Sequence, residues 1–357
     1  MAYTIINKSS EHFNTKLWTG NGSTQSITGV GFQPDFTWGK SRSASYSVGY
    51  HILSDVVRGV TKSINSNNNS VETTSTNLFT SFDSNGFSIG SNAALNASAD
   101  TSVAWNWKAG GGQGSSNTDG SINTTYTSVN TTAGFSISKY SGNTTAGATI
   151  GHGLGAVPKM VMIKNLTSNE NWVVYHASLG ATKHLRLNGT EAQATQAGQF
   201  NNTEPTSSLI SLGDFGSVNE SPEIYVAYAF TEKQGYSKFG KLISNGSDDG
   251  TFTYTGFAPK WVMVKPNVTD GWSHWYIFDT TRDTNLNDKP LYANLSTQEA
   301  YYGGSPATNY AQIDMLSNGF KIRRGSGWGG GGNGTELIYM AFGQSLVGTN
   351  NVPCTAR

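Results

Sequence analysis

Short apolar runs rich in β-branched and aromatic residues, separated by polar turns, recur along the chain. Three of these runs share one pattern: a Gly stands three residues before a Pro, an apolar run follows, and a Lys stands six residues after the Pro. The copies are residues 31–40 (GFQPDFTWGK), 155–164 (GAVPKMVMIK) and 256–265 (GFAPKWVMVK). Each copy predicts a turn followed by a strand, and the recurrence indicates an internal repeat.

Further signals follow the three copies in a fixed order. An Asn-Gly-Phe turn lies at residues 85–87 and again at 318–320, whereas the middle unit lacks it. Each unit then closes on a strand of small and aromatic residues, at 103–105, 226–228 and 340–342. Short strands with a turn every ten or so residues are typical of antiparallel sandwiches. We therefore expect an all-β chain of three tandem related β-sandwich modules, of jelly-roll or lectin-like type.

Glycine-rich and polar segments divide the chain. Residues 110–121 are the clearest linker, because Gly and Ser there favour a flexible connection. Length agrees with this division, since 357 residues fit two or three domains. The expected organisation is an N-terminal arm or edge strand (1–16), module 1 (17–109), the linker (110–121), module 2 (122–234), module 3 (235–346) and a C-terminal tail (347–357).

Composition and hydropathy argue against several classes of protein. Charged residues make up only 13% of the chain, with 23 basic and 23 acidic side chains, which does not favour nucleic acid as a partner. No stretch approaches the roughly 20 apolar residues of a membrane helix, so we expect no membrane span. The N-terminus lacks the pattern of a signal peptide, which indicates synthesis in a cytoplasm. The single Cys354 leaves no intrachain disulfide.

Candidate catalytic or metal chemistry is sparse. No nucleophile elbow, zinc-protease helix, phosphate-binding loop or paired-cysteine spacing occurs. His152, in the Gly-rich turn 151–155, is placed like a loop ligand, but no second His or carboxylate lies nearby in the sequence, which favours a plain turn histidine. Two acidic groups offer oxygen ligands for Ca²⁺ without the spacing of a defined calcium loop, so solvated turns are the other interpretation. These groups are Asp248 with Asp249, and Asp279 with Asp283 and Asp288. We expect no cofactor, no metal and no enzyme activity.

Aromatic residues fall into two sets. The first recurs on predicted strands and is expected to fill the sandwich cores: Trp38, Trp105, Trp107, Trp172, Trp261 and Trp275. The second, Trp272, Tyr301, Tyr302 and Trp328, lies among Gly, Asn and Ser in the long loops of module 3. Exposed flat rings there would stack on sugars or anchor a protein partner, and packing within the loops is the third interpretation.

The repeated strands combine with four further motifs, at residues 20–22 (GNG), 115–122 (SSNTDGSI), 151–155 (GHGLG) and 235–240 (GYSKFG). With these motifs the chain resembles, from end to end, a family of tailed-phage virion proteins from marine and cyanobacterial phages, usually labelled tail-fibre-like. The resemblance implies a part of a phage particle, made in the host cytoplasm and located in the virion. It supplies no catalytic residues.

Two roles remain open within such a particle. The first is a compact protein attached in multiple copies to other virion proteins as capsid decoration, cement or head fibre, where three modules in one chain would imitate a trimer at a threefold position. The alternative is a tail fibre-like adhesin that binds host surface glycan through the loops of module 3. A glycan-degrading enzyme is a third reading. The absence of a heptad-repeat stem favours the first role.

Overall fold

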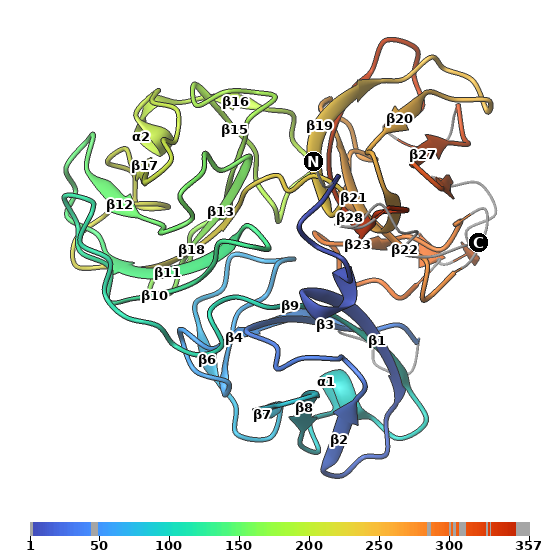
Figure 1. Ribbon diagram of the computed structural model, residues 1–357, viewed down its shortest axis with the longest axis horizontal. Coiled ribbons are helices and arrows are strands. Elements are labelled where there is room, and N and C mark those ends of the chain that lie inside the picture. The colour runs from blue at the N-terminus through green and yellow to red at the C-terminus, as the bar shows by residue number, and fades with distance from the viewer. Residues whose placement is uncertain are drawn as a thin grey trace.

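Three lobes surround a common centre in the computed structural model (Figure 1). The structure describes residues 3–43, 49–283, 287–299, 301–302, 305–306, 312–325, 328 and 330–347, and of 301–302 and 305–306 the backbone alone. Nearly all regular structure is β, in antiparallel sheets that pack face to face, so the predicted all-β sandwich class is confirmed. We call the lobes module 1 (residues 13–107), module 2 (126–230) and module 3 (237–344).

Module 1 packs a larger sheet, of order β1-β9-β3-β4, against a smaller one, of order β2-β8-β7. Its larger sheet contains β1 (Phe13–Thr19), β3 (Phe36–Ser41), β4 (His51–Asp55) and β9 (Thr101–Trp107). Its smaller sheet contains β2 (Gln25–Thr28), β7 (Phe79–Asp83) and β8 (Gly86–Ile89). The other elements are η1 (Ser9–Glu11) in the preceding arm, the pair β5 (Lys62–Ser63) and β6 (Thr73–Thr74), and α1 (Ala93–Asn96).

Module 2 has a larger sheet of order β10-β11-β18-β13-β14 and a two-stranded sheet, β12-β17. The larger sheet contains β10 (Tyr126–Asn130), β11 (Phe135–Ser141), β13 (Met160–Asn165), β14 (Val173–His176) and β18 (Ile224–Phe230). The remaining elements are β12 (Thr149–Gly151), β17 (Leu209–Ser211), the pair β15 (Lys183–His184) and β16 (Ala194–Thr195), and α2 (Ala197–Phe200).

Module 3 has a larger sheet of order β19-β28-β21-β22-β23 and a smaller one of order β20-β27-β26. The larger sheet contains β19 (Ser237–Ile243), β21 (Ala258–Pro266), β22 (Tyr276–Asp279), β23 (Leu291–Tyr292) and β28 (Glu336–Gln344). The smaller contains β20 (Phe252–Tyr254), β26 (Ile313–Leu316) and β27 (Gly319–Ile322). A separate pair is formed by β24 (Tyr301–Tyr302) and β25 (Ser305–Pro306).

One four-strand order recurs in the three larger sheets: β1-β9-β3-β4, β11-β18-β13-β14 and β19-β28-β21-β22. The hairpin with the Asn-Gly turn completes the smaller sheet of modules 1 and 3, as β7-β8 and β26-β27. Module 2, whose sequence lacks that turn, has only β12 and β17 there. The common strand order supports duplication of one unit, which stays a prediction.

Both faces of each larger sheet are buried, which explains why the repeated strands are continuous apolar runs rather than alternating ones. In β13, Met160 and Met162 point into a core shared by all three modules, whereas Val161 and Ile163 point into the core of module 2. Module 3 repeats this division, and module 1 has its own separate core as well. The three modules therefore share a fourth hydrophobic core at the centre.

Aromatic rings dominate the central core. The indole of Trp107 from module 1 lies 5.6 Å from the ring of Trp261 and 5.7 Å from that of Phe342, both in module 3. The same indole lies 6.4 Å from Phe230 of module 2. The six tryptophans predicted to be core residues are all buried. One side chain of module 1 thus packs against rings of both other modules.

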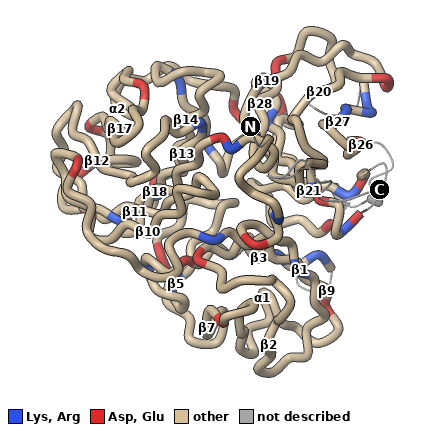
Figure 2. The backbone as a smooth tube through the Cα atoms, viewed as in Figure 1, with Lys and Arg blue, Asp and Glu red and all other residues tan. Residues whose placement is uncertain are grey.

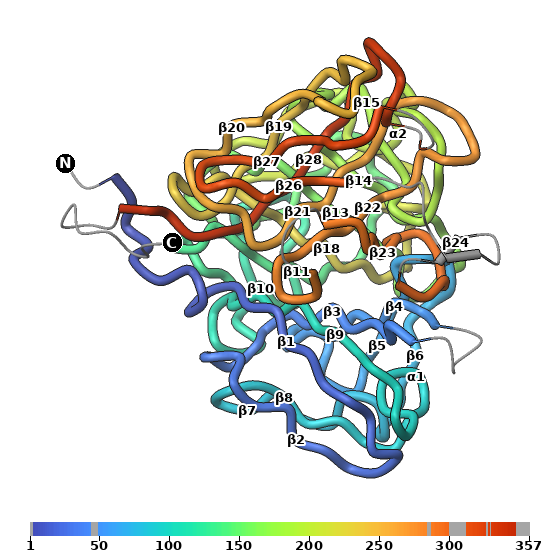
Figure 3. The backbone as a smooth tube through the Cα atoms, turned by 90° about the vertical axis from the view of Figure 1, so that its right-hand side faces the viewer, coloured from blue at the N-terminus to red at the C-terminus, as the bar shows by residue number. Residues whose placement is uncertain are grey.

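The boundaries of module 1 differ in one respect from the predicted ones. The first strand begins at Phe13 and pairs along its length with β9, so the last part of the segment expected as an arm belongs to the larger sheet. The rest of the arm crosses to module 3, where the hydroxyl of Tyr3 donates to the carbonyl of Gly256 (2.7 Å). The two ends of the described chain lie on the same side of the molecule (Figure 3).

Polar contacts at the module junctions follow a cyclic order. The lysine six residues after the repeated Pro is buried in every module. Each of these lysines donates from Nζ to a main-chain carbonyl of the preceding module around the ring. The pairs are Lys164 in module 2 with Asn69 in module 1 (3.2 Å), Lys265 in module 3 with Thr190 in module 2 (3.1 Å) and Lys40 in module 1 with Ser296 in module 3 (3.4 Å). The third pair closes the ring between modules that no linker joins directly.

Candidate binding surfaces

Trp328, expected as an exposed contact, is instead a core residue. Its side chain is 5% exposed, belongs to the core of module 3 and meets the ring of Tyr276 edge-on at 5.0 Å. The indole nitrogen donates to the carbonyl of Arg324 (2.9 Å). A Cβ at Gly330 would lie 2.6 Å from this indole, so the glycine lets the ring pack against the backbone. The expectation of an exposed ring at Trp328 is corrected accordingly.

Of the two predicted contact residues whose side chains the structure describes, Trp272 is the one at the surface, with 42% exposed. Its backbone N–H donates to Asp270 Oδ1 (2.9 Å), and its carbonyl accepts from the hydroxyl of Tyr276. Tyr301 and Tyr302 form β24, but their side chains lie outside the described residues. The structure therefore does not bring the four predicted residues together as one described surface.

An apolar patch that the sequence analysis missed lies on the smaller sheet of module 3. Phe252 and Tyr254 of β20 are 44% and 59% exposed. The corresponding outward positions of β2 in module 1 carry Ser26 and Thr28, by their equivalent pairing with the hairpin strand. The alternation of Phe252, Thr253 and Tyr254 was the available signal, because alternate residues of a strand face opposite sides.

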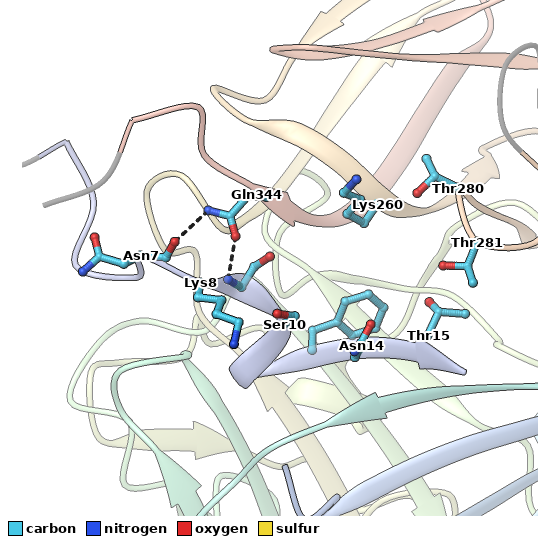
Figure 4. Close-up of a pocket in the computed structure, with 11 residues that line it drawn as sticks. Asn7, Lys8, Ser10, Asn14, Thr15, Lys260, Thr280, Thr281 and Gln344 are labelled. Atoms are coloured by element: carbon cyan, nitrogen blue, oxygen red, sulfur yellow. Dashed lines mark hydrogen bonds between the residues drawn. The ribbon is translucent and has the colours of Figure 1, made fainter. Parts of the chain in front are cut away.

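A cavity of about 520 Å³ lies where the N-terminal arm, module 1 and module 3 meet (Figure 4). Gln344, at the end of β28, holds the N-terminal arm beside the cavity by two hydrogen bonds. Its Oε1 accepts from the N–H of Ser9 (2.7 Å), and its Nε2 donates to the carbonyl of Asn7 (3.1 Å). The cavity therefore lies between the end of a sheet and an arm that is hydrogen-bonded to it.

Hydroxyl, amide and ammonium groups line this cavity. Thr280 and Thr281, which follow β22, face Asn14 and Thr15 of β1 across it. Lys260 on β21 and Lys8 on the arm supply positive charge near the same space. Such groups can hydrogen-bond to a polar ligand, and the volume is within the roughly 300–1,000 Å³ typical of ligand pockets. None of the described residues that line the cavity is a carboxylate.

A second candidate is a shallow groove on module 2. Two adjacent cavities of about 200 and 180 Å³ share His184, Arg186 and Gln196. The ring of Phe215, 39% exposed, borders the groove. His184 is 5% exposed and its Nδ1 has no hydrogen-bond partner among the described residues. Burial, and then the charge of Arg186, lower the pKa of His184, so the imidazole is neutral at pH 7.

Two of the acidic residues considered as calcium ligands, Asp279 and Asp249, form ion pairs with basic side chains. Asp279 is buried in an ion pair with Arg282, with 2.5 Å between Oδ2 and Nε, and also accepts from the indole of Trp105 in module 1 (2.9 Å). Asp249 pairs with Lys321 and Arg323 at the surface. Within the described residues, no three His, Cys, Asp or Glu side chains gather as a metal-binding group.

His152 is a turn residue held by local bonds. Its Nδ1 accepts from the N–H of Leu154 (3.2 Å), and its Nε2 lies 3.3 Å from the carbonyl of Thr206. Burial lowers the pKa of His152, as it does for His176, whose pKa falls to about 4. These histidines are neutral at pH 7 and are positioned by backbone groups rather than aimed at a ligand.

Charge is spread over the molecule. Figure 2 shows acidic and basic residues in all three lobes. Among the parts of the chain that are described, no helix is long and apolar enough to cross a bilayer.

The fold thus defines an all-β protein of antiparallel sandwich modules around one centre. A family model described as "Domain of unknown function (DUF7483)" matches residues 8–345, so the chain belongs to that family. The matched range contains all three modules. No curated protein and no solved structure matched the chain.

Proposed function

We propose that this protein is a non-enzymatic structural component of a tailed-phage virion, attached to the capsid as a decoration or cement protein. The resemblance of the sequence to tailed-phage virion proteins supports the assignment to a phage particle. The cyclic order of contacts supports the position, because Lys40, Lys164 and Lys265 join the three modules head to tail into a closed ring.

A closed ring of three similar lobes suits a threefold position. Three identical neighbours around a symmetry axis present three equivalent surfaces, and a partner meets them equally when it offers three similar faces. Homotrimers provide this by symmetry. Here a single chain provides three larger sheets with the same four-strand order. Binding one copy then fixes three neighbours without assembly of a trimer.

The test is a reconstruction of purified virions, with this chain located by its density. The proposal predicts one three-lobed body at each occupied threefold or local threefold position of the shell. Density confined to the tail tip, or absence of the chain from washed particles by mass spectrometry, would contradict it.

An adhesin that binds host surface glycan is the second candidate, favoured by the groove on module 2. Amide and charged side chains such as Gln196 and Arg186 can hydrogen-bond to sugar hydroxyls, and the exposed ring of Phe215 can stack on a sugar face. Polysaccharide from the host should then retain the wild-type protein on a column. The variant Phe215→Ala should elute earlier and Phe252→Ala should not. Equal elution of all three proteins would remove this candidate.

A further inference from the structure

Strand β1 forms an open edge of module 1. Among the described strands it pairs with β9 alone, in an antiparallel register that aligns Asn14 with Asn106. The N–H of Lys108 donates to the carbonyl of His12 (2.9 Å), which shows that the even-numbered residues of β1 turn their main-chain groups toward β9. Main-chain groups alternate in direction along an antiparallel strand. The groups of Phe13, Thr15 and Leu17 therefore point away from the sheet.

These outward groups have no hydrogen-bond partner among the described residues. Thr15 is only 8% exposed and lines the cavity beside the strand. Unpaired buried main-chain groups are uncommon in proteins and mark a place where a partner or ordered water belongs.

Module 2 fills the corresponding edge with a strand of its own. Strand β11 occupies the place of β1, and its odd-numbered residues turn outward in the same way. There β10 pairs with it, aligning Asn130 with Phe135 and Ser128 with Ile137. The N–H of Thr125 donates to the carbonyl of Lys139 (2.7 Å). The same sheet edge is therefore closed in one module and open in another.

The linker completes the filling between modules 1 and 2. Asp35 in module 1 and Lys260 in module 3 are equivalent positions, each one residue after the repeated Pro. The Oδ2 atom of Asp35 accepts hydrogen bonds from the N–H groups of Ala109 (2.7 Å) and Gly111 (2.9 Å) in the linker. The side-chain amide of Gln113, also in the linker, donates to the carbonyl of Val57 (3.2 Å). Val57 in module 1 is the position equivalent to Thr281 in module 3. Between modules 3 and 1 the same place is the cavity of about 520 Å³.

We propose that the edge of β1 and this cavity are a binding site for an extended segment of a second polypeptide, added to module 1 as an outer antiparallel strand. A sheet edge offers N–H and C=O groups at the spacing of a strand, which a polypeptide matches. The segment carries small polar or glycine residues, because Thr280, Thr281 and Asn14 crowd the cavity and offer hydrogen bonds. This site is distinct from the outer groove of module 2.

The probe for the test is a synthetic fluorescent peptide with the sequence of residues 109–130, which contains the linker and β10. We expect the full-length protein to bind it and to show slowed hydrogen exchange at the amides of Phe13, Thr15 and Leu17. Thr15→Pro removes one outward N–H, and Thr281→Trp fills the cavity from an exposed position. Each change should weaken binding at least tenfold.

Two controls make the result decisive. Lys241→Pro alters an outward position on the open edge of β19, remote from the cavity, and Thr28→Trp adds an indole to an exposed position on β2. Both should bind the peptide like the wild type. If Thr15→Pro lowers the melting temperature, Thr281→Trp decides alone. Absence of peptide binding, or equal binding by Thr281→Trp and Thr28→Trp, would overturn the proposal.

Discussion

The ammonium group of Lys164 in module 2 donates a hydrogen bond to the main-chain carbonyl of Asn69 in module 1, with 3.2 Å between the two atoms. The same group reaches the carbonyl of Glu170 (3.0 Å) and that of Asn165 (2.7 Å), so all three of its hydrogens have acceptors. A buried lysine at a strand end is costly unless its donors are satisfied. One of the three acceptors of Lys164, the carbonyl of Asn69, belongs to module 1, so the full set of hydrogen bonds forms only when modules 1 and 2 are packed together.

Replacing Lys164 with methionine should destabilise the protein by about 2–4 kcal/mol. The buried carbonyl of Asn165 loses its donor, at roughly 1–3 kcal/mol, and the partly buried carbonyls of Asn69 and Glu170 add smaller losses, while relief from burying the charge offsets part of the total. Chemical denaturation at pH 7 measures the change. Lys241→Met is the control, since that side chain is half exposed and should shift stability by less than about 0.5 kcal/mol. Equal effects of the two changes would refute the role given to Lys164.

Stability should rise as the pH increases from 7 to 9. Burial lowers the pKa of Lys40 and of Lys265 to about 7 and that of Lys164 to about 8, from an ordinary value of 10.5. The unfolded chain therefore binds more protons than the folded chain in this range, so the free energy of unfolding increases with pH. Urea midpoints at several pH values measure the slope. The double variant Lys40→Met/Lys265→Met should flatten it, and an unchanged slope would contradict the assignment.

Asp55 forms a buried ion pair within module 1 and accepts a hydrogen bond from module 2. Its Oδ2 lies 2.6 Å from Nε of Arg58 and accepts from the hydroxyl of Tyr228 in module 2 (2.7 Å). Asp55→Asn leaves the buried guanidinium with Glu72 (3.2 Å) as its remaining ionic partner and should cost about 3 kcal/mol. Asp249→Asn, at an exposed pair, should cost less than about 1 kcal/mol. Thermal melts compare the two, and similar melting temperatures would show that the buried pair contributes little.

Truncation of two tryptophans of module 3 should lower stability by clearly different amounts. Trp328→Ala removes a packed indole from a core and should cost about 3–5 kcal/mol. Trp272→Ala affects a side chain that is 42% exposed and should cost about 1 kcal/mol or less. Guanidinium denaturation provides both values. A Trp328→Ala variant as stable as the wild type would contradict the burial of Trp328 in the core of module 3.

Local pattern predicted much of the fold. The apolar runs after the repeated Pro form β3, β13 and β21, because continuous burial on both sheet faces leaves a strong signal in the sequence. The Asn-Gly turns at residues 85–86 and 318–319 produced the expected hairpins. The resemblance to phage proteins and the duplication of the modules remain predictions.

The shared centre could not be read from the sequence. Apolar residues on both faces of a strand predict burial but not which neighbour covers each face, so nothing marked Trp107 as the contact among three modules. Trp328 was misjudged because glycine-rich sequence is typical of exposed loops. In this loop, Gly330 removes the Cβ that would collide with the indole. The cavity beside β1 arises from segments far apart in sequence, such as Thr15 and Thr281, and had no local signal.

Scanning calorimetry of the full chain tests the central claim most directly. If the three modules share one core and one ring of junction contacts, the protein unfolds in a single transition, and the calorimetric and van 't Hoff enthalpies agree. Three transitions, or a calorimetric enthalpy about three times the van 't Hoff value, would mean that the modules unfold independently and would contradict the account.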